Sequence, residues 1–184
     1  MFNEEKSAHV AAYLLRKRGG KMSYMKLIKL MYLADRDAMD RYGDPITDDH
    51  WVSMRHGPVL SNVLELVQGG SRSGEWEKWV IPSRVAYEAE LAKEISIDDL
   101  DELSRADIAS LDRVWEEFGS MDRWQLVDLV HETCAEWKDP NGSAFPISPQ
   151  DVFKALGRSS SQSEVEATKI FQRRRVEEIF SEIR

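Results

Sequence analysis

Residues 23–42, SYMKLIKLMYLADRDAMDRY, predict a long helix with a wide apolar face. Apolar side chains return every three or four positions along this stretch, which is the spacing that lines one side of an α-helix. The stripe consists of Tyr24, Leu27, Ile28, Met31, Ala34 and Ala38, and it is widened by Leu30, Leu33 and Met39. Ser23 precedes the helix and is expected to cap its first turn. Because so much of the helix surface is apolar, we expect burial on more than one side.

Glycine and proline mark the boundaries of the neighbouring elements. A Gly-Gly pair ends an N-terminal helix that the apolar spacing predicts over residues 4–18. After a Gly-Asp-Pro break, alternating residues predict a short hairpin over 46–55. Gly57 and Pro58 are expected to end that hairpin and to begin a helix, because proline is tolerated in the first helical turn.

The rest of the chain predicts a second hairpin, further helices and a tail. The predicted elements are a hairpin over 76–91, a helix over 104–118 with a capping box of Ser104 and Asp107, a helix from Trp124 to Trp137, and a short helix from Ser148 to Leu156. Beyond them, a serine-rich linker is expected over 158–163 and a charged helix over 164–184. The predicted fold class is therefore mainly α (α+β), a compact helical domain over 1–157 with two small β-hairpins, followed by the linker and the C-terminal helix.

Composition indicates a globular chain with an uneven charge distribution. Of the 184 residues, 42% are hydrophobic and 32% are charged, which is ordinary for one folded domain. The formal net charge of −8 disfavours a general nucleic-acid-binding role, because phosphate contacts need a cationic surface. Residues 1–41 hold nine Lys/Arg and five Asp/Glu, a net of +4, whereas 42–184 hold 16 and 28, a net of −12.

A group of basic residues surrounds the first predicted turn between helices. It comprises Arg16, Lys17, Arg18, Lys21, Lys26 and Lys29. Solvated cations that complement a helix C-terminus are the favoured explanation for this cluster. A docking patch for an acidic partner is the alternative.

The chain carries no sequence feature of export or membrane insertion. Cys134 is the sole cysteine, so no disulfide can form within the chain, which fits a reducing compartment. The first residues lack the basic start and apolar run of a signal peptide. The longest unbroken apolar run is 10–15, far short of the ~20 residues that span a bilayer. We therefore expect a cytoplasmic protein with no membrane contact.

No motif in the chain predicts catalysis. A phosphate-binding glycine loop, a nucleophile elbow and a paired-cysteine zinc motif are all missing from the sequence. His131 and Cys134 share a helical face, and a hydrogen-bonded structural histidine with a buried, inert cysteine is the favoured interpretation. Because no metal-ligand spacing is met, ordinary helix salt bridges are the interpretation for Asp35, Asp37, Asp40, Asp48 and Asp49. We expect no metal, no cofactor and no enzymatic activity.

Two further features concern contacts with other molecules. The chain has six tryptophans, of which most are expected in the core and one or two at an interface. Residues 55–58, Arg-His-Gly-Pro, place two side chains that can carry positive charge at a tight corner. This corner is either purely structural or also a site of partner recognition.

Several motifs, in the same order along the chain, resemble the Panacea domain of the SocA-like antitoxin family. The matching segments are 26–34 (KLIKLMYLA against K-L-x-K-L-x-Y-x-A), 42–46 (YGDPI against Y-G-x-P-I/L), 55–59 (RHGPV against R-x-G-P-V), Leu103-Ser104, and 126–137 with His131. Together they extend the resemblance over about 7–157 and leave out the tail.

The resemblance implies a mainly α-helical domain with small strands and a non-enzymatic antitoxin function. Family members neutralise a co-encoded protein toxin by direct binding, and many are encoded by prophages. The candidate partner-binding residues are the family-matching polar positions Lys29, Tyr32, Arg55, His56 and His131. The toxin itself does not follow from the resemblance, because partners differ widely within the family.

Other functions remain as hypotheses. One family member is an adaptor that hands its toxin to a protease, and here the tail after Ser159 could dock such a protease. A narrow apolar stripe over 176–183 also allows homo-oligomerisation through the C-terminal helix. A hydrolase or metal enzyme built around His56 and His131 is a third hypothesis, and autoregulation through the basic turn is a fourth.

Overall fold

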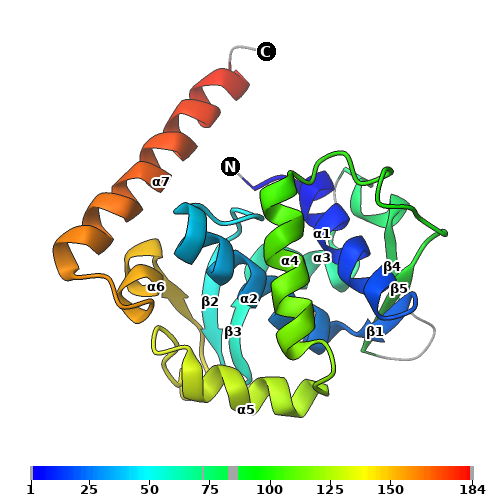
Figure 1. The fold of residues 1–184 in the computed structure, drawn as a ribbon, viewed down its shortest axis with the longest axis horizontal. Helices are drawn as coiled ribbons and strands as arrows, with labels where there is room; N and C mark the ends of the chain where they lie inside the picture. The colour runs from blue at the N-terminus through cyan, green and yellow to red at the C-terminus, as the bar shows by residue number, and fades with distance from the viewer. Residues whose placement is uncertain (1, 72, 83–86, 183–184) are drawn as a thin grey trace.

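The structure, a computed structural model, describes residues 2–71, 73–82 and 87–182. These residues form a mainly α-helical fold with two small antiparallel sheets, as the sequence predicts (Figure 1). The helices are α1 (Glu4–Lys17), α2 (Tyr24–Tyr42), α3 (Ser61–Val67), α4 (Arg105–Phe118), α5 (Arg123–Thr133), α6 (Pro149–Ala155) and α7 (Ser160–Glu182), with a 3₁₀ turn η1 (Trp76–Lys78). The strands are β1 (Lys21–Ser23), β2 (Trp51–Met54), β3 (Gly57–Leu60), β4 (Val80–Pro82), β5 (Glu88–Leu91) and β6 (Phe145–Ile147).

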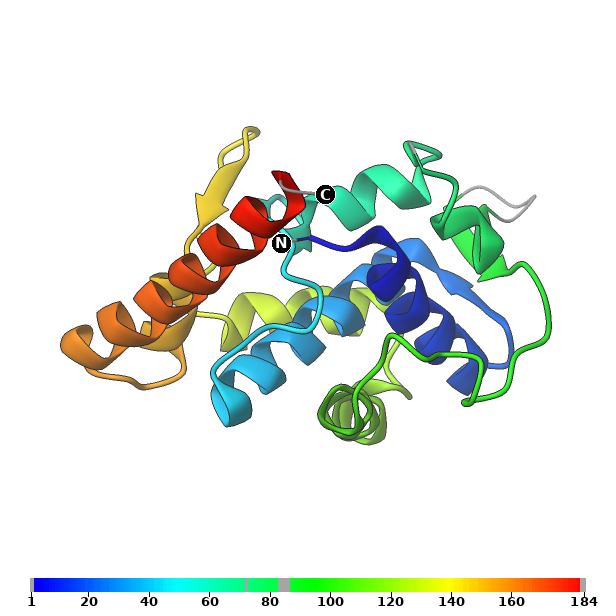
Figure 2. The ribbon, with the colours of Figure 1, turned by 90° about the horizontal axis from the view of Figure 1, so that it is seen from above.

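Helix α2 is the central element of the core. Its apolar stripe is buried together with polar residues that include Lys29, Tyr32 and Asp35. Helices α1, α4 and α5 pack around it, and β3 lies against it as well (Figures 1 and 2). The prediction of burial on more than one side is confirmed. Each fully buried leucine, such as Leu27 or Leu30, contributes about 2 kcal/mol through removal of apolar surface from water.

Each sheet joins segments that are distant in the sequence. The strand order is β1-β5-β4 in one sheet and β3-β2-β6 in the other. Strand β1, which the sequence does not predict, pairs Ser23 with Glu88. The Ser23 side chain makes no capping hydrogen bond, contrary to the prediction, because its backbone belongs to this strand. The predicted second hairpin is confirmed as β4 and β5, and its connection, 83–86, lies outside the described residues.

The predicted hairpin over 46–55 is wrong in its pairing. Strand β2 pairs instead with β3, which follows it, and with the distant β6. Ile46 and Thr47 form no strand because their backbone N–H groups donate to the buried Asp35 carboxylate. Pro58 lies in β3, at the edge of the sheet, where its missing N–H is tolerated. The next helix, α3, therefore begins after this strand and not at Pro58.

The helices that follow begin where the sequence predicts. The capping box of Ser104 and Asp107 at the start of α4 is present. Helix α5 ends at Thr133 and does not reach Trp137. The chain leaves the helix there, and the Trp137 indole N–H donates to the Met54 carbonyl of β2 at 2.9 Å.

The predicted linker over 158–163 is mostly the first turn of α7, which begins at Ser160. Ser159 and Gln162 exchange hydrogen bonds in the pattern of a capping box. The Ser159 hydroxyl accepts a hydrogen bond from the backbone N–H of Gln162, and the Gln162 carboxamide oxygen accepts one from the backbone N–H of Ser159. The serine-rich composition therefore starts a helix here.

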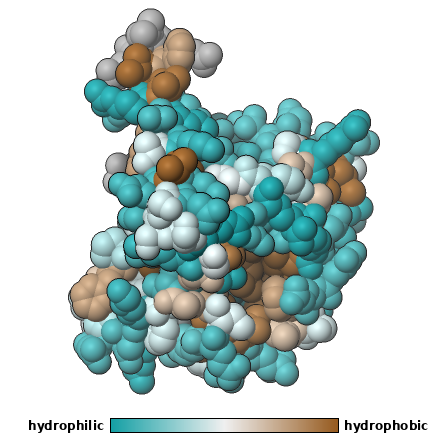
Figure 3. All heavy atoms as spheres, turned by 60° about the vertical axis from the view of Figure 1, so that its left-hand side comes forward, coloured by the Kyte–Doolittle hydropathy of each residue, from teal (hydrophilic) through white to brown (hydrophobic). Residues whose placement is uncertain are grey.

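Helix α7 lies along one edge of the molecule, at the opposite end from the β1-β5-β4 sheet (Figures 1 and 2). Its first half packs on α6 and buries Ala167 and Ile170. Arg173 holds its middle through an ion pair with Asp48 at 3.0 Å. The exposed apolar side chains nearer its projecting end (Figure 3) are Val176, Ile179 and Phe180. Ile183, the last member of the predicted stripe, lies outside the described residues.

The aspartates of α2 and the loop after it take two different roles. Asp37 forms the predicted helix salt bridge with Arg41 and a second ion pair with Arg113 of α4. Asp35 and Asp49 are buried instead and accept hydrogen bonds from backbone N–H groups. Asp40 and Asp48 also form ion pairs, with Arg158 and Arg173. The salt-bridge prediction is therefore confirmed for Asp37, Asp40 and Asp48 and is wrong for Asp35 and Asp49.

Candidate functional site at the turn of the β2–β3 hairpin

Arg55 and His56 form the two-residue turn between β2 and β3, where Met54 faces Gly57. Both turn residues keep negative φ, whereas Gly57 has φ +94°. This is typical of hairpin loops in which a turn is followed by a glycine in the left-handed region. The Arg55 and His56 side chains are exposed. The hairpin therefore presents a guanidinium and an imidazole to solvent at its tip.

Lys29 supports the turn from inside the core. Its ammonium group donates a hydrogen bond to the Pro58 carbonyl at 2.7 Å, and the residue is only 1% exposed. Burial lowers the pKa of Lys29 to about 7. A Cβ atom at Gly57 would lie 3.3 Å from this ammonium nitrogen. The turn and the lysine therefore pack with no room for a further side chain.

Aromatic side chains from α5 and the loop after it flank the turn. The His56 ring lies edge-on to Trp124, with ring centroids 5.6 Å apart. The His131 ring stacks on the Trp137 ring, with centroids 4.1 Å apart. The Trp137 indole N–H in turn donates a hydrogen bond to the Met54 carbonyl. These contacts fix one end of the hairpin against α5 (Figure 1). They leave Trp124 half-exposed, at 50% of its full surface.

A buried polar network holds the loop that carries Trp137. The Tyr32 hydroxyl donates to Glu136 Oε1 at 2.7 Å, and Arg36 Nε donates to the same oxygen at 2.9 Å. Burial, together with the Glu136 carboxylate, raises the pKa of Tyr32 well above its ordinary value. The phenol therefore remains a hydrogen-bond donor at neutral pH. Because Glu136 directly precedes Trp137, Tyr32 acts on the turn indirectly, through this loop.

An apolar groove of about 230 Å³ opens beside the turn. Its apolar lining comes from Tyr24, Met25, Ile28, Met54, Val59 and Leu64. Arg55 and His56 also line it, so its edge is polar. The groove is smaller than the ~300–1,000 Å³ typical of small-molecule sites, and it suits a side chain of a partner protein. We call Arg55, His56, Trp124 and this groove the hairpin surface.

The five predicted partner-binding residues gather around this one place and differ in exposure. Arg55 and His56 are exposed on the hairpin surface. Lys29 and Tyr32 are buried beneath it, and His131 is half-buried in its stack. Direct contact with a partner is therefore open to the turn residues, whereas the buried pair can act only by positioning them.

Two residues of the site are not singled out by the sequence. Trp124 is one of six tryptophans, and its place in the first turn of α5 is the only signal that it is exposed. Glu136 follows the end of α5 and belongs to no motif. Its role depends on Tyr32 and Arg36, about a hundred residues earlier in the chain.

Burial shifts the pKa values of two titratable groups below the turn, the Cys134 thiol and the His131 imidazole. Burial raises the pKa of the Cys134 thiol to about 12, so the thiol stays protonated at neutral pH and is a poor nucleophile. Burial, with the nearby Lys29 charge, lowers the pKa of His131. The buried Nε2 of His131 has no hydrogen-bond partner among the described residues, so stacking on Trp137 positions the ring.

Two features of the described residues bear on the metal-enzyme hypothesis and on membrane contact. Within the described ranges, no three His, Cys, Asp or Glu side chains are grouped so that they could hold a metal ion. None of the helices in those ranges has both the length and the apolar character needed to cross a bilayer.

A mainly helical domain with an exposed cationic turn, a half-exposed tryptophan and an apolar groove has the features of a protein-binding domain. Residues 27–138, more than half of the chain, match the model of the family described as antitoxin SocA-like, Panacea domain. The chain belongs to this family. The matched region contains the hairpin turn and α5 but is narrower than the range of about 7–157 expected from the motifs. No curated protein and no solved structure matches the chain.

Stability is expected to rise with pH above neutrality because of Lys29. Its pKa is about 7 in the folded protein against an ordinary value of 10.5, so between these values the unfolded chain binds a proton that the folded protein has lost. The free energy of unfolding should therefore increase by about 2 kcal/mol between about pH 7 and about pH 9. Chemical denaturation across this interval measures the rise, and Lys29→Met should abolish it.

The control for this prediction is Lys154→Met, which removes an exposed lysine from α6. This variant should keep the full rise of the wild type. If Lys29→Met gains stability with pH in parallel with the wild type, the buried lysine is not its source.

Proposed function

We propose that this protein is an antitoxin that neutralises a co-encoded protein toxin by direct binding through the hairpin surface. The observation that supports this most is that Arg55 and His56, in the family-matching segment 55–59, form the exposed turn of a firmly held hairpin. Family membership supports a toxin as the general class of partner. Because α2 and α5 already hold the turn in place, little conformational freedom is lost on binding.

In this proposal each part of the hairpin surface has a distinct role. The groove receives an apolar side chain of the toxin, and Trp124 packs beside it as an anchor residue. Arg55 pairs with a carboxylate at the rim of the interface. The net charge of −8 favours a basic toxin overall, because complementary potentials speed the encounter. Binding then covers the active face of the toxin in the cytoplasm, and no catalytic step is needed.

The test is co-expression with the product of the adjacent gene, combined with a binding measurement on the purified pair. The double variant Arg55→Glu/Trp124→Ala changes two exposed side chains and should remain folded. We expect its Kd for the toxin to increase about 100-fold and its protection of cells to be lost, because tryptophan and arginine anchors dominate such interfaces.

A matched control separates the hairpin surface from general surface changes. Arg105→Glu/Phe145→Ala replaces the same kinds of exposed residue at other places, in α4 and β6. This variant should bind and protect like the wild type. The proposal fails if no neighbouring product is toxic, if a toxic one is not relieved, or if both double variants protect equally.

The exposed stripe on α7 supports delivery of the toxin to a protease as a second candidate function. Deleting the tail would also remove the buried Ala167 and Ile170, so substitution of exposed residues is the cleaner test. The variant Val176→Ser/Ile179→Ser/Phe180→Ser changes only the stripe. Delivery predicts a longer toxin half-life in cells that carry this variant, whereas an unchanged half-life with full protection leaves direct occlusion as the mechanism.

A further inference from the structure

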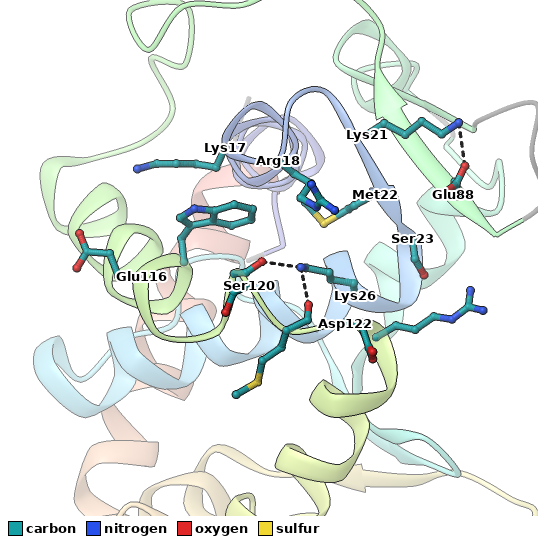
Figure 4. Close-up of a pocket in the computed structure, with 14 residues that line it drawn as sticks. Lys17, Arg18, Lys21, Met22, Ser23, Lys26, Glu88, Glu116, Ser120 and Asp122 are labelled. Atoms are coloured by element: carbon teal, nitrogen blue, oxygen red, sulfur yellow. Dashed lines mark hydrogen bonds and ion pairs between the residues drawn. The ribbon is translucent and has the colours of Figure 1, made fainter.

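An open cleft of about 870 Å³ lies between the α1–β1 turn, the start of α2 and the α4–α5 loop (Figure 4). Three apolar side chains, Met22, Trp115 and Met121, contribute to its walls. The cleft is separate from the groove of the hairpin surface and is several times larger. A cleft with this volume and lining can hold a short run of polypeptide, with its side chains on both polar and apolar walls.

The charges in this cleft are opposite in sign to those of the chain as a whole. Its cations are Lys17, Arg18, Lys21, Lys26 and Arg123, and its acids are Glu88, Glu116 and Asp122. Some cations are already paired, such as Lys21 with Glu88 at 2.9 Å (Figure 4). In the part of the chain that the structure describes, the side chains of Arg18 and Arg123 form no hydrogen bond or ion pair, and the Arg123 guanidinium lies 5.5 Å from the centre of the Trp124 ring. Both residues are exposed, so their guanidinium groups can pair with carboxylates of another molecule.

Lys26 places a further positive charge inside the cleft. Its ammonium group donates to the carbonyls of Gly119 and Met121, both at 2.6 Å (Figure 4). Burial, and then the nearby charge of Arg18, lower the pKa of Lys26. Two like charges are thus held close together, and a carboxylate placed near them would relieve their repulsion.

The start of α2 places the positive end of a helix at the same cleft. It contains no acidic residue, and no side chain caps it. The Ser23 hydroxyl, which belongs to the lining of the cleft, is buried and has no hydrogen-bond partner within the described residues. The positive end of this helix therefore reinforces the cationic side chains around it.

We propose that this basic cleft binds an acidic, partly apolar peptide segment of a partner protein. Carboxylates of the segment pair with Arg18 and Arg123, and an apolar residue between them packs on Met22 and Trp115. A nucleic acid fits less well, because Glu88 and Asp122 would face its phosphates. Peptide carboxylates can be spaced to avoid these acids. The inference does not depend on the toxin assignment, since its test uses peptides and this protein alone.

The experiment begins with selection of a random displayed peptide library on the purified full chain. Acidic peptides with interspersed apolar residues should be enriched. A labelled peptide from this set is then titrated with the wild type and with Arg18→Glu/Arg123→Glu at about 50 mM and about 500 mM salt. We expect the charge reversal to weaken binding at least about 10-fold at low salt and high salt to weaken binding by the wild type.

A control variant and a competing probe complete the design. Arg105→Glu/Arg175→Glu reverses two exposed arginines outside the cleft and should bind the peptide like the wild type. If circular dichroism shows that the charge-reversed protein is unfolded, the neutral Arg18→Gln/Arg123→Gln replaces it. Selection of no acidic peptide, equal affinity in the cleft and control variants, or tighter binding of labelled oligothymidylate than of the peptide would each overturn the proposal.

Discussion

Asp35→Ala is expected to lower the free energy of unfolding by about 4 kcal/mol. One carboxylate oxygen accepts hydrogen bonds from the backbone N–H groups of Ile46 and Thr47, at 3.0 and 2.9 Å. The other accepts from the Thr47 hydroxyl at 2.6 Å and from the Trp51 indole at 3.2 Å. Alanine would leave these donors buried and unpaired, and each costs about 1 kcal/mol or more. Urea denaturation of the wild type and the variant measures the loss.

Two further variants make this result specific. Asp35→Asn keeps an acceptor for the two backbone N–H groups but turns an amide NH₂ toward the Trp51 indole, so we expect about half of the loss. Asp128→Ala removes an exposed aspartate of α5 and should change stability by less than about 0.5 kcal/mol. A loss of under about 1 kcal/mol in Asp35→Ala would show that the segment from Ile46 to Trp51 is held by other contacts.

The same carboxylate also makes stability depend on pH. Burial raises the pKa of Asp35 from 3.8 to about 6, despite the hydrogen bonds that favour its charged form. Between these values the folded protein holds a proton that the unfolded chain has released, so this contribution to stability is present at low pH and is lost as pH rises toward about 6. The stability difference between the wild type and Asp35→Asn should therefore shrink over this interval.

The sequence predicts those parts of the fold that depend on nearby residues. The apolar stripe of α2, the capping box of α4 and the hairpin of β4 and β5 are each encoded within a short stretch, and each is present. The turn at Arg55 and His56 is likewise marked by its own residues as an unusual corner. Local pattern is sufficient in these cases because the stabilising contacts are themselves local.

The remaining features depend on groups that meet from distant positions. Ile46 and Thr47 are predicted as the first strand of a hairpin, but their backbone N–H groups donate to the Asp35 carboxylate and not to a neighbouring strand. Proline is tolerated both in the first turn of a helix and in an edge strand, so the sequence around Pro58 allows either. The pairing of β3 with β2 decides for the strand. Lys29 and Arg55 are both polar positions of the family motifs, yet packing of β3 and α5 on α2 buries only the first.

Gly57→Ala is expected to lower the free energy of unfolding by about 3 kcal/mol. Gly57 has φ +94°, a conformation that costs an L-residue about 1–2 kcal/mol. In addition, a Cβ atom there would lie only 2.5 Å from Val130 Cγ2, so α5 must move or the turn must shift. Such overpacking costs a further ~1–3 kcal/mol. Thermal and urea denaturation measure the total.

The conformational and steric parts of this effect can be separated. Gly69 has φ +90° with nothing within 4 Å of its Cβ position, so Gly69→Ala should lose only about 1 kcal/mol. Val130→Ala removes the clashing methyl group, and the double variant with Gly57→Ala should therefore be more stable than the sum of the single losses predicts. Equal losses of stability in Gly57→Ala and Gly69→Ala would mean that α5 does not pack closely against the turn. In that case Arg55 and His56 would not be held in place by α5, and the rigid hairpin surface on which toxin binding is proposed would lose its main support.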